Sequence, residues 1–98
     1  MSYLATVTFD LRGATSQNYR DLSESLARLG FRSQIGGDAG TASDLPTTTF
    51  AGKFTGASTA KVRDDLLGSV RTALVNLGLH GKFFLVVGDG WAWGIRTT

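Results

Sequence analysis

In the stretch Leu4-Ala5-Thr6-Val7-Thr8-Phe9-Asp10, apolar and polar residues alternate. Successive side chains of a β-strand point to opposite faces of a sheet, so this stretch predicts a strand with two unlike faces. The residues expected to pack against helices are Ala5, Val7 and Phe9. The residues expected on the other side are Thr6, Thr8 and Asp10. We therefore expect a sheet that is covered on one side and uncovered on the other.

Length and composition indicate one globular domain spanning residues 1–98. A chain of 98 residues leaves no room for a second core, and its 42% hydrophobic and 18% charged residues are typical of a folded protein. Cysteine is absent, which excludes a disulfide framework, a thiolate nucleophile and a cysteine-based zinc site. The chain must therefore hold itself together by ordinary core packing.

The net charge and the apolar runs say little about which class of partner the protein binds. Ten basic residues against eight acidic ones give a net charge of +2, a mild preference for an anionic partner. The first residues lack a basic segment followed by an apolar core, and the longest apolar run, Phe83 to Val87, is too short to span a bilayer. We expect a cytoplasmic protein without a membrane partner.

Two segments have the three- and four-residue apolar spacing of amphipathic helices. The first begins after a cap at Thr15 or Ser16, ends at Gly30, and has the stripe Tyr19, Leu22, Leu26 and Leu29. The second is capped within Gly56-Ala57-Ser58-Thr59, ends at Gly78, and has the stripe Val62, Leu66, Val70, Ala73 and Leu77. Gly68 lies in the middle of this helix and should cost about 1 kcal/mol relative to alanine.

Further strands are predicted on either side of the second helix. Phe31–Ile35 alternates with Phe31, Ser33 and Ile35 inward, the small and polar segment 36–44 is expected to be a loop, and Thr47–Thr55 follows Pro46. The last two strands would be Lys82–Val87 and, after an Asp89-Gly90 hairpin, Trp91–Arg96. The order predicts an α+β, ferredoxin-like β-α-β-β-α-β fold with two helices on one face of an antiparallel sheet and an added C-terminal strand.

The uncovered side of this sheet, which we call the open face, is a candidate nucleic-acid platform. Cationic groups can contact phosphates while an aromatic ring stacks on a base. The candidate nucleic-acid-binding residues are Arg12, Arg32, Lys53, Lys82 and Phe84. The alternative is a solvated or dimer-covered sheet face with no such role.

Asp10 is the candidate catalytic and metal-binding residue. A carboxylate at the end of a central strand can meet its own copy across a two-fold axis, and paired carboxylates can hold a divalent cation. The alternative is structural, because an aspartate after a strand commonly caps the next turn by accepting hydrogen bonds from backbone amides.

The C-terminal segment predicts a homodimer. If Phe83, Leu85 and Val87 face the helices, Phe84 and Val86 must look outward. A second apolar row, the candidate dimer interface, consists of Trp91, Trp93 and Ile95. This segment could fold back beside its own preceding strand or extend the sheet of a partner, and in both cases we expect a dimer.

At Val7-Thr8-Phe9-Asp10, followed by the helix ending at Gly30-Phe31, by Leu45-Pro46 and by Phe50, the chain resembles the GhoS family of antitoxin endoribonucleases. These small ferredoxin-like proteins are related in fold to CRISPR-associated endonucleases of the adaptation machinery. The resemblance implies RNA binding or cleavage of a toxin message in a toxin–antitoxin system, with Asp10 matching the strand-end aspartate of the wider fold family. Our hypothesis is therefore a nucleic-acid-binding protein or an endoribonuclease that acts on single-stranded RNA with Mg²⁺ or Mn²⁺.

Two features depart from the antitoxin pattern. Asp21 and Ser23 stand where the family carries basic residues in the middle of its first helix. Trp91-Ala92-Trp93 instead resembles the added C-terminal strand with which the CRISPR relatives complete their dimers. The alternative to an RNA-acting protein is thus a non-catalytic homodimeric interaction module whose open face is buried between two copies.

Overall fold

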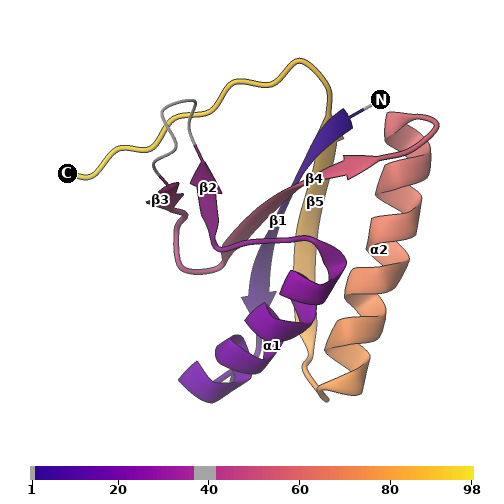
Figure 1. Cartoon of the computed structure of the whole chain (residues 1–98). Coiled ribbons are helices and arrows are strands. Elements are labelled where there is room, and N and C mark those ends of the chain that lie inside the picture. Colours follow the sequence, from indigo (N-terminus) through magenta and orange to yellow (C-terminus); the bar gives the residue numbers. More distant parts are fainter. Residues whose placement is uncertain (1, 37–41) are drawn as a thin grey trace.

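The structure, a computed structural model, describes residues 2–36 and 42–98 and has an α+β architecture (Figure 1). Along the chain the elements are β1 (Ser2–Leu11), α1 (Ser16–Leu29), β2 (Gln34–Gly36), β3 (Ala42–Asp44), β4 (Thr49–Thr55), α2 (Thr59–Asn76) and β5 (Gly81–Gly88). An antiparallel sheet has the order β4-β1-β5, and β2 and β3 form a small second sheet. Strands distant in sequence thus meet around β1.

The central strand β1 separates the two sides of the sheet as its alternation predicts. Its buried side chains are Tyr3, Ala5, Val7 and Phe9, and they pack in one core with residues of both helices. The ring of Phe9 contacts those of Phe50 on β4 and Phe83 on β5, with centroids 5.9 and 5.8 Å apart. Aromatic contacts therefore join all three strands beneath the helices.

Both helices begin and bury residues largely as the sequence indicates. Thr15 caps α1 in a capping box with Asn18, and Ser58 caps α2 by accepting a hydrogen bond from the amide of Lys61. The buried helical residues are Leu22, Leu26, Val62, Leu66, Val70 and Leu74. Leu74 is deeper than the expected Ala73, because it continues the four-residue spacing of Val62, Leu66 and Val70.

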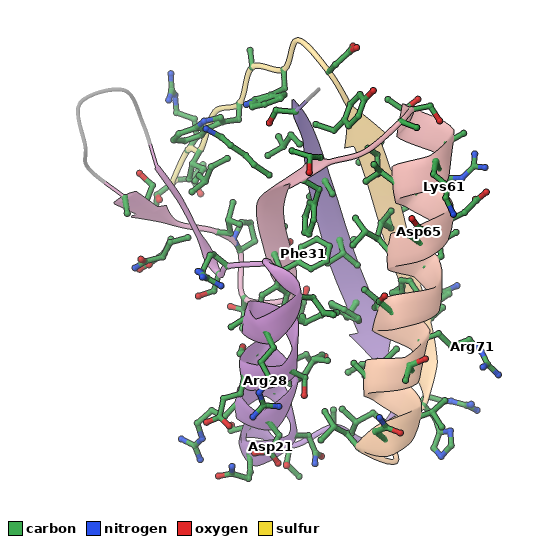
Figure 2. All side chains as sticks on the ribbon, turned by 45° about the vertical axis from the view of Figure 1, so that its right-hand side comes forward. Asp21, Arg28, Phe31, Lys61, Asp65 and Arg71 are labelled. Atoms are coloured by element: carbon green, nitrogen blue, oxygen red, sulfur yellow. The ribbon has the colours of Figure 1, made fainter. Side chains whose placement is uncertain are left out.

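The two helices end in the same way. The amides of Gly30 and Phe31 donate to the carbonyls of Ala27 and Leu26, and those of Gly78 and Leu79 donate to Val75 and Leu74. These are Schellman motifs, in which glycine adopts positive φ and the next residue returns to the core. Phe31 accordingly points inward between α1 and the sheet, whereas Lys61, Asp65 and Arg71 point away from α2 (Figure 2).

The prediction of a strand over Phe31–Ile35 is wrong in its first half. Phe31 is buried as part of the helix end, Arg32 makes an isolated bridge to Ala51, and Ser33 is exposed instead of inward. β2 starts only at Gln34 and pairs with β3 at Ala42–Asp44, inside the predicted loop. The rest of that loop, residues 37–41, lies outside the described residues. The apolar residue Phe31, which predicted a strand, belongs instead to the motif that ends α1.

β4 also starts later than Pro46 suggests. The amide of Thr49 donates to the carbonyl of Pro46, so residues 47 and 48 form a turn and the strand begins at Thr49. Its register with β1 nevertheless puts Phe50 and Phe54 on the helix side and Thr49, Ala51 and Lys53 on the open face, as predicted.

The prediction of a C-terminal strand is wrong. Residues 91–98 form no strand, and the tail crosses the strand ends toward β2 and β3 (Figure 1). Lys53 on β4 lies with its Nζ 5.7 Å from the centre of the Trp91 ring, which puts this ring on the far side of β1 from β5. Gly90, at φ 60°, turns the chain in this direction. The tail thereby brings Trp91 next to Lys53 and leaves the outer edge of β5 unpaired in the described sheet.

Neither α1 nor α2, the helices in the described part of the chain, is both long and apolar enough to cross a membrane.

Gly52 lets the C-terminal end of α1 approach β4. A methyl group added at Gly52 would overlap the carbonyl oxygen of Gly30, which is backbone and cannot swing away. We expect Gly52→Ala to lower the free energy of unfolding by about 3 kcal/mol, measured by chemical denaturation. The control is Gly68→Ala in α2, where nothing lies within 4 Å and alanine should stabilise by about 1 kcal/mol. A neutral Gly52→Ala would contradict this helix–strand contact.

Candidate nucleic-acid interface

The strand register determines which side chains share the open face. Directly opposed residues of antiparallel strands lie on the same face, so the neighbours of Thr6, Thr8 and Asp10 can be read from the pairing. On β4 they are Ala51 and Thr49, with Lys53 opposite Leu4. On β5 they are Val86, Phe84 and Lys82. The predicted open-face residues of these three strands are therefore brought together.

Two apolar side chains stand uncovered on this face. Phe84 is 65% exposed and Val86 is 50% exposed, and both belong to β5, which has β1 as its one neighbour in the described sheet. An exposed phenylalanine flanked by threonine hydroxyls offers a ring for stacking and polar groups for hydrogen bonds. This is the aromatic centre that the sequence predicts.

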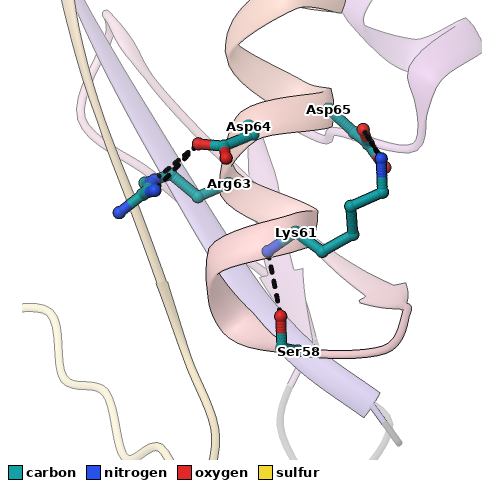
Figure 3. Close-up of polar contacts among 5 residues, drawn as sticks. All are labelled: Ser58, Lys61, Arg63, Asp64 and Asp65. Atoms are coloured by element: carbon teal, nitrogen blue, oxygen red, sulfur yellow. Dashed lines mark hydrogen bonds and ion pairs between the residues drawn. The ribbon is translucent and has the colours of Figure 1, made fainter.

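The basic residues of the open face differ from two at the start of α2 in having no acidic partner, a property that Arg20, Arg28 and Arg71 of the helices share with them among the described residues. On α2, Lys61 contacts Asp65 and Arg63 contacts Asp64, each at 2.9 Å (Figure 3). The hydrogen bond to Asp65 raises the pKa of Lys61. Within residues 2–36 and 42–98, by contrast, Arg12, Arg32, Lys53 and Lys82 have no carboxylate within 4.0 Å. The cations of the open face remain available to an anion, whereas those at the start of α2 are already paired.

The side chain of Arg32 is held by hydrogen bonds within the protein. Its Nη1 donates to the carbonyls of Ala27 and Phe31, at 3.0 and 3.2 Å, where the C-terminal end of α1 exposes acceptors. The side chain therefore fixes a positive charge beside the sheet edge, and it is less free than Lys53 or Lys82 to follow a ligand.

A groove of about 680 Å³ lies beside β4, at the end of the open face where the C-terminal tail passes. Its walls include Arg32, Gln34, Lys53, Trp91 and Trp93. Trp91 is half-buried, Trp93 is 41% exposed, and Lys53 lies over the Trp91 ring. The sequence assigns these tryptophans, with Ile95, to a dimer interface. The contact of Lys53 with the Trp91 ring could not be predicted from any local pattern.

Asp10 lies at the other end of the open face. It shares a depression of about 240 Å³ with Arg12, Gly81 and Lys82. Its carboxylate accepts no hydrogen bond from the described residues, so the alternative that it caps the following turn is not supported. The amide of Arg12 donates to the carbonyl of His80 at 2.8 Å, which continues the pairing of β1 with β5 by one residue.

The predicted catalytic residue and the groove are far apart. Leu4, which lines the groove, is six residues from Asp10 along β1, or about 20 Å at the rise of an extended strand. The part of the chain that the structure describes contains no group of three or more His, Cys, Asp or Glu side chains placed to hold a metal ion. The candidates thus form two sites on one face: a groove at one end and a carboxylate with two cations at the other.

A scan against protein-family models finds no match to the chain, and a search of curated proteins finds none either. The resemblance to the GhoS family stays a prediction, which depends on Phe9-Asp10 and on hydrophobic spacing.

Proposed function

We propose that the protein binds single-stranded RNA along its open face. The observation that carries this proposal is that the open face combines the exposed ring of Phe84 with cations at both of its ends, Arg32 and Lys53 at one and Arg12 and Lys82 at the other. Among the described residues none of these four cations has a carboxylate within 4.0 Å. Single strands suit such a surface, because their bases can stack on aromatic rings while their phosphates meet lysine and arginine.

We also propose a ferredoxin-like fold, because this fold would leave the open face free for RNA. We interpret the chain as ferredoxin-like, with β1 between β4 and β5 and with β2 beside β4 through the bridge from Arg32 to Ala51. Sheets with helices on one side present their other side to a ligand, as in RNA-recognition domains that stack two or three bases on a four-stranded sheet. This arrangement supports binding without implying a reaction.

Cleavage of the RNA is the less supported half of the hypothesis. Within one chain the residues around Asp10 do not fit Mg²⁺ or Mn²⁺, because a single carboxylate stands beside two cations that repel a divalent ion. A metal-dependent endoribonuclease of the antitoxin type would need a second carboxylate, for example from another copy of the chain. We therefore propose binding as the function and derive no catalytic step.

A second candidate function, a homodimeric interaction module, is favoured by the outer edge of β5. The edge is self-complementary: in an antiparallel pair centred on Leu85, Phe84 would oppose the partner's Val86, and Lys82 would oppose the partner's Gly88. Phe84 of each copy would then pack beside Val86 of the other, and the two Lys82 groups would lie at opposite ends of the strand pair. Edge strands with unpaired backbone groups are prone to such pairing.

For RNA binding, we expect Lys53→Ala plus Lys82→Ala to weaken the affinity for a labelled single-stranded RNA about tenfold in low salt, because two phosphate contacts are removed. Measured by fluorescence anisotropy over a series of salt concentrations, the plot of log affinity against log salt should become shallower by about 1.4. The matched control is Lys61→Ala plus Arg71→Ala, which removes two charges from exposed positions of α2. Equal losses in both double variants would refute a site on the open face.

For Asp10, we expect Asp10→Asn to bind RNA about twofold to threefold more tightly than the parent chain, because it removes a negative charge next to Arg12 and Lys82. The same anisotropy titration measures this change. In a parallel incubation of RNA with Mg²⁺ or Mn²⁺, both proteins should leave the RNA intact. Cleavage by the parent chain that disappears in Asp10→Asn would instead establish the nuclease hypothesis.

For the dimer, we expect light scattering at micromolar concentration to give twice the mass of the chain, and Val86→Lys to return it to a monomer by placing a charge in the strand pair. The circular-dichroism spectrum should not change. A control substitution at another exposed apolar position, Val75→Lys on α2, should stay dimeric. A monomeric parent chain would eliminate this second candidate.

A further inference from the structure

The groove beside β4 has features that the rest of the open face lacks. Its volume of about 680 Å³ lies in the range of small-molecule sites, which is about 300–1,000 Å³. Its lining residues Leu4, Ala51 and Lys53 also belong to the open face. An RNA strand bound to that face would therefore pass next to the groove. A flat stacking platform does not need such a hollow.

The two tryptophans make the aromatic side of the groove. Trp91 and Trp93 are separated by one residue on an extended, unpaired tail, and both line the hollow. Trp93 is 41% exposed although it is large and apolar, which leaves ring surface for a planar partner. Stacking of a nucleobase on an aromatic ring tolerates every base, because each base has a π face.

The cations give the groove its charge complementarity to a phosphate. The Nζ of Lys53 lies 5.7 Å from the centre of the Trp91 ring, so a positive charge stands beside the stacking surface. Arg32 adds a second charge that is held by two carbonyl groups. In the described part of the chain neither cation has a carboxylate within 4.0 Å, so an anionic group is the partner that this end of the groove favours.

Gln34 adds an acceptor to the wall. Its Nε2 donates to Oδ1 of Asp44 at 2.7 Å, which fixes the amide, while its Oε1 accepts no hydrogen bond from the described residues. A carbonyl oxygen held in this way can accept from the exocyclic amino group of adenine or cytosine, whereas uracil has no such group. The wall therefore favours an amino-bearing base.

We propose that this groove binds one unstacked nucleotide of a single-stranded RNA, with its base against Trp91 and Trp93, its phosphate at Lys53, and an amino group of the base at Gln34. The proposal rests on the proposed RNA binding and adds the part of the ligand that enters the hollow. It makes the groove a site for a free mononucleotide as well, since all the contacts come from one nucleotide.

Intrinsic fluorescence tests this proposal directly. The chain has two tryptophans and both line the groove, so selective excitation of tryptophan reports on this site alone. Titration with AMP should quench the emission saturably, UMP should bind at least threefold more weakly, and inorganic phosphate should leave the emission unchanged. Adenosine without its phosphate should also bind more weakly than AMP, because Lys53 then has no anion to contact.

Variants assign the contacts. Trp93→Ala, which leaves Trp91 as the reporter, and Lys53→Met should each weaken AMP binding about tenfold, and Gln34→Leu should remove the preference for AMP over UMP. The matched control Lys61→Met removes a lysine from α2 and should leave AMP binding unchanged. Unchanged circular-dichroism spectra would show that each variant is folded.

The failures are distinguishable. If AMP does not quench but RNA still binds in a way that depends on Lys82 and Phe84, the nucleotide groove is refuted and RNA binding on the open face stands. If AMP quenches equally in the parent chain, Trp93→Ala and Lys53→Met, binding lies elsewhere and the proposal is refuted. If neither AMP nor RNA binds, the groove and the proposed function fail together.

Discussion

The burial of one side of β1 is the interaction on which the rest of the structure depends. Tyr3, Ala5, Val7 and Phe9 have at most 5% of their surface exposed, and the strand pairs along most of its length with β4 and β5. Because side chains alternate along a strand, burying these four requires that Thr6, Thr8 and Asp10 face the other way. A shift of the register by one residue would bring Asp10 into the core, so packing under the helices also determines the composition of the open face.

The C-terminal end of α1 links the packing of the core to the position of Arg32 in the groove. The Schellman turn at Gly30 returns Phe31 to the core, where its ring lies 4.9 Å from that of Phe54, and so places Arg32 beside Ala51 at the edge of β4. The absence of a side chain at Gly52 allows this close approach. A cation of the proposed site is therefore positioned by backbone geometry that has no contact with a ligand.

What the sequence could predict was local. The alternation of β1, the caps of both helices and the outward direction of Phe84 and Val86 follow from spacing over a few residues, and the structure confirms them. The helical stripes are confirmed as well, except that Leu74 is buried in place of Ala73. The errors arise where the same residues suit more than one local structure, or where a contact joins distant parts of the chain. Phe31 had the apolar character of a strand residue but serves a helix end, and β3 is a strand only through pairing with β2. The groove could not be predicted, since Lys53 and Trp91 are 38 residues apart and meet only when the tail crosses the sheet.

The path of the tail changes the argument for self-association. The sequence shows more apolar surface than one sheet with helices on a single side can hide, and a dimer through the C-terminal residues is one way to cover it. In the structure the tail covers part of this excess within its own chain, since Trp91 packs over β4 and Ala51 is only 4% exposed. On the three-stranded sheet, Phe84 and Val86 remain exposed, at the opposite edge from the tail. Pairing of two β5 edges would use backbone groups that RNA on the open face does not contact. The groove beside β4 is also two strands away from that edge. The two candidate functions therefore compete for Phe84 alone, and a dimer would extend the cationic face instead of burying it.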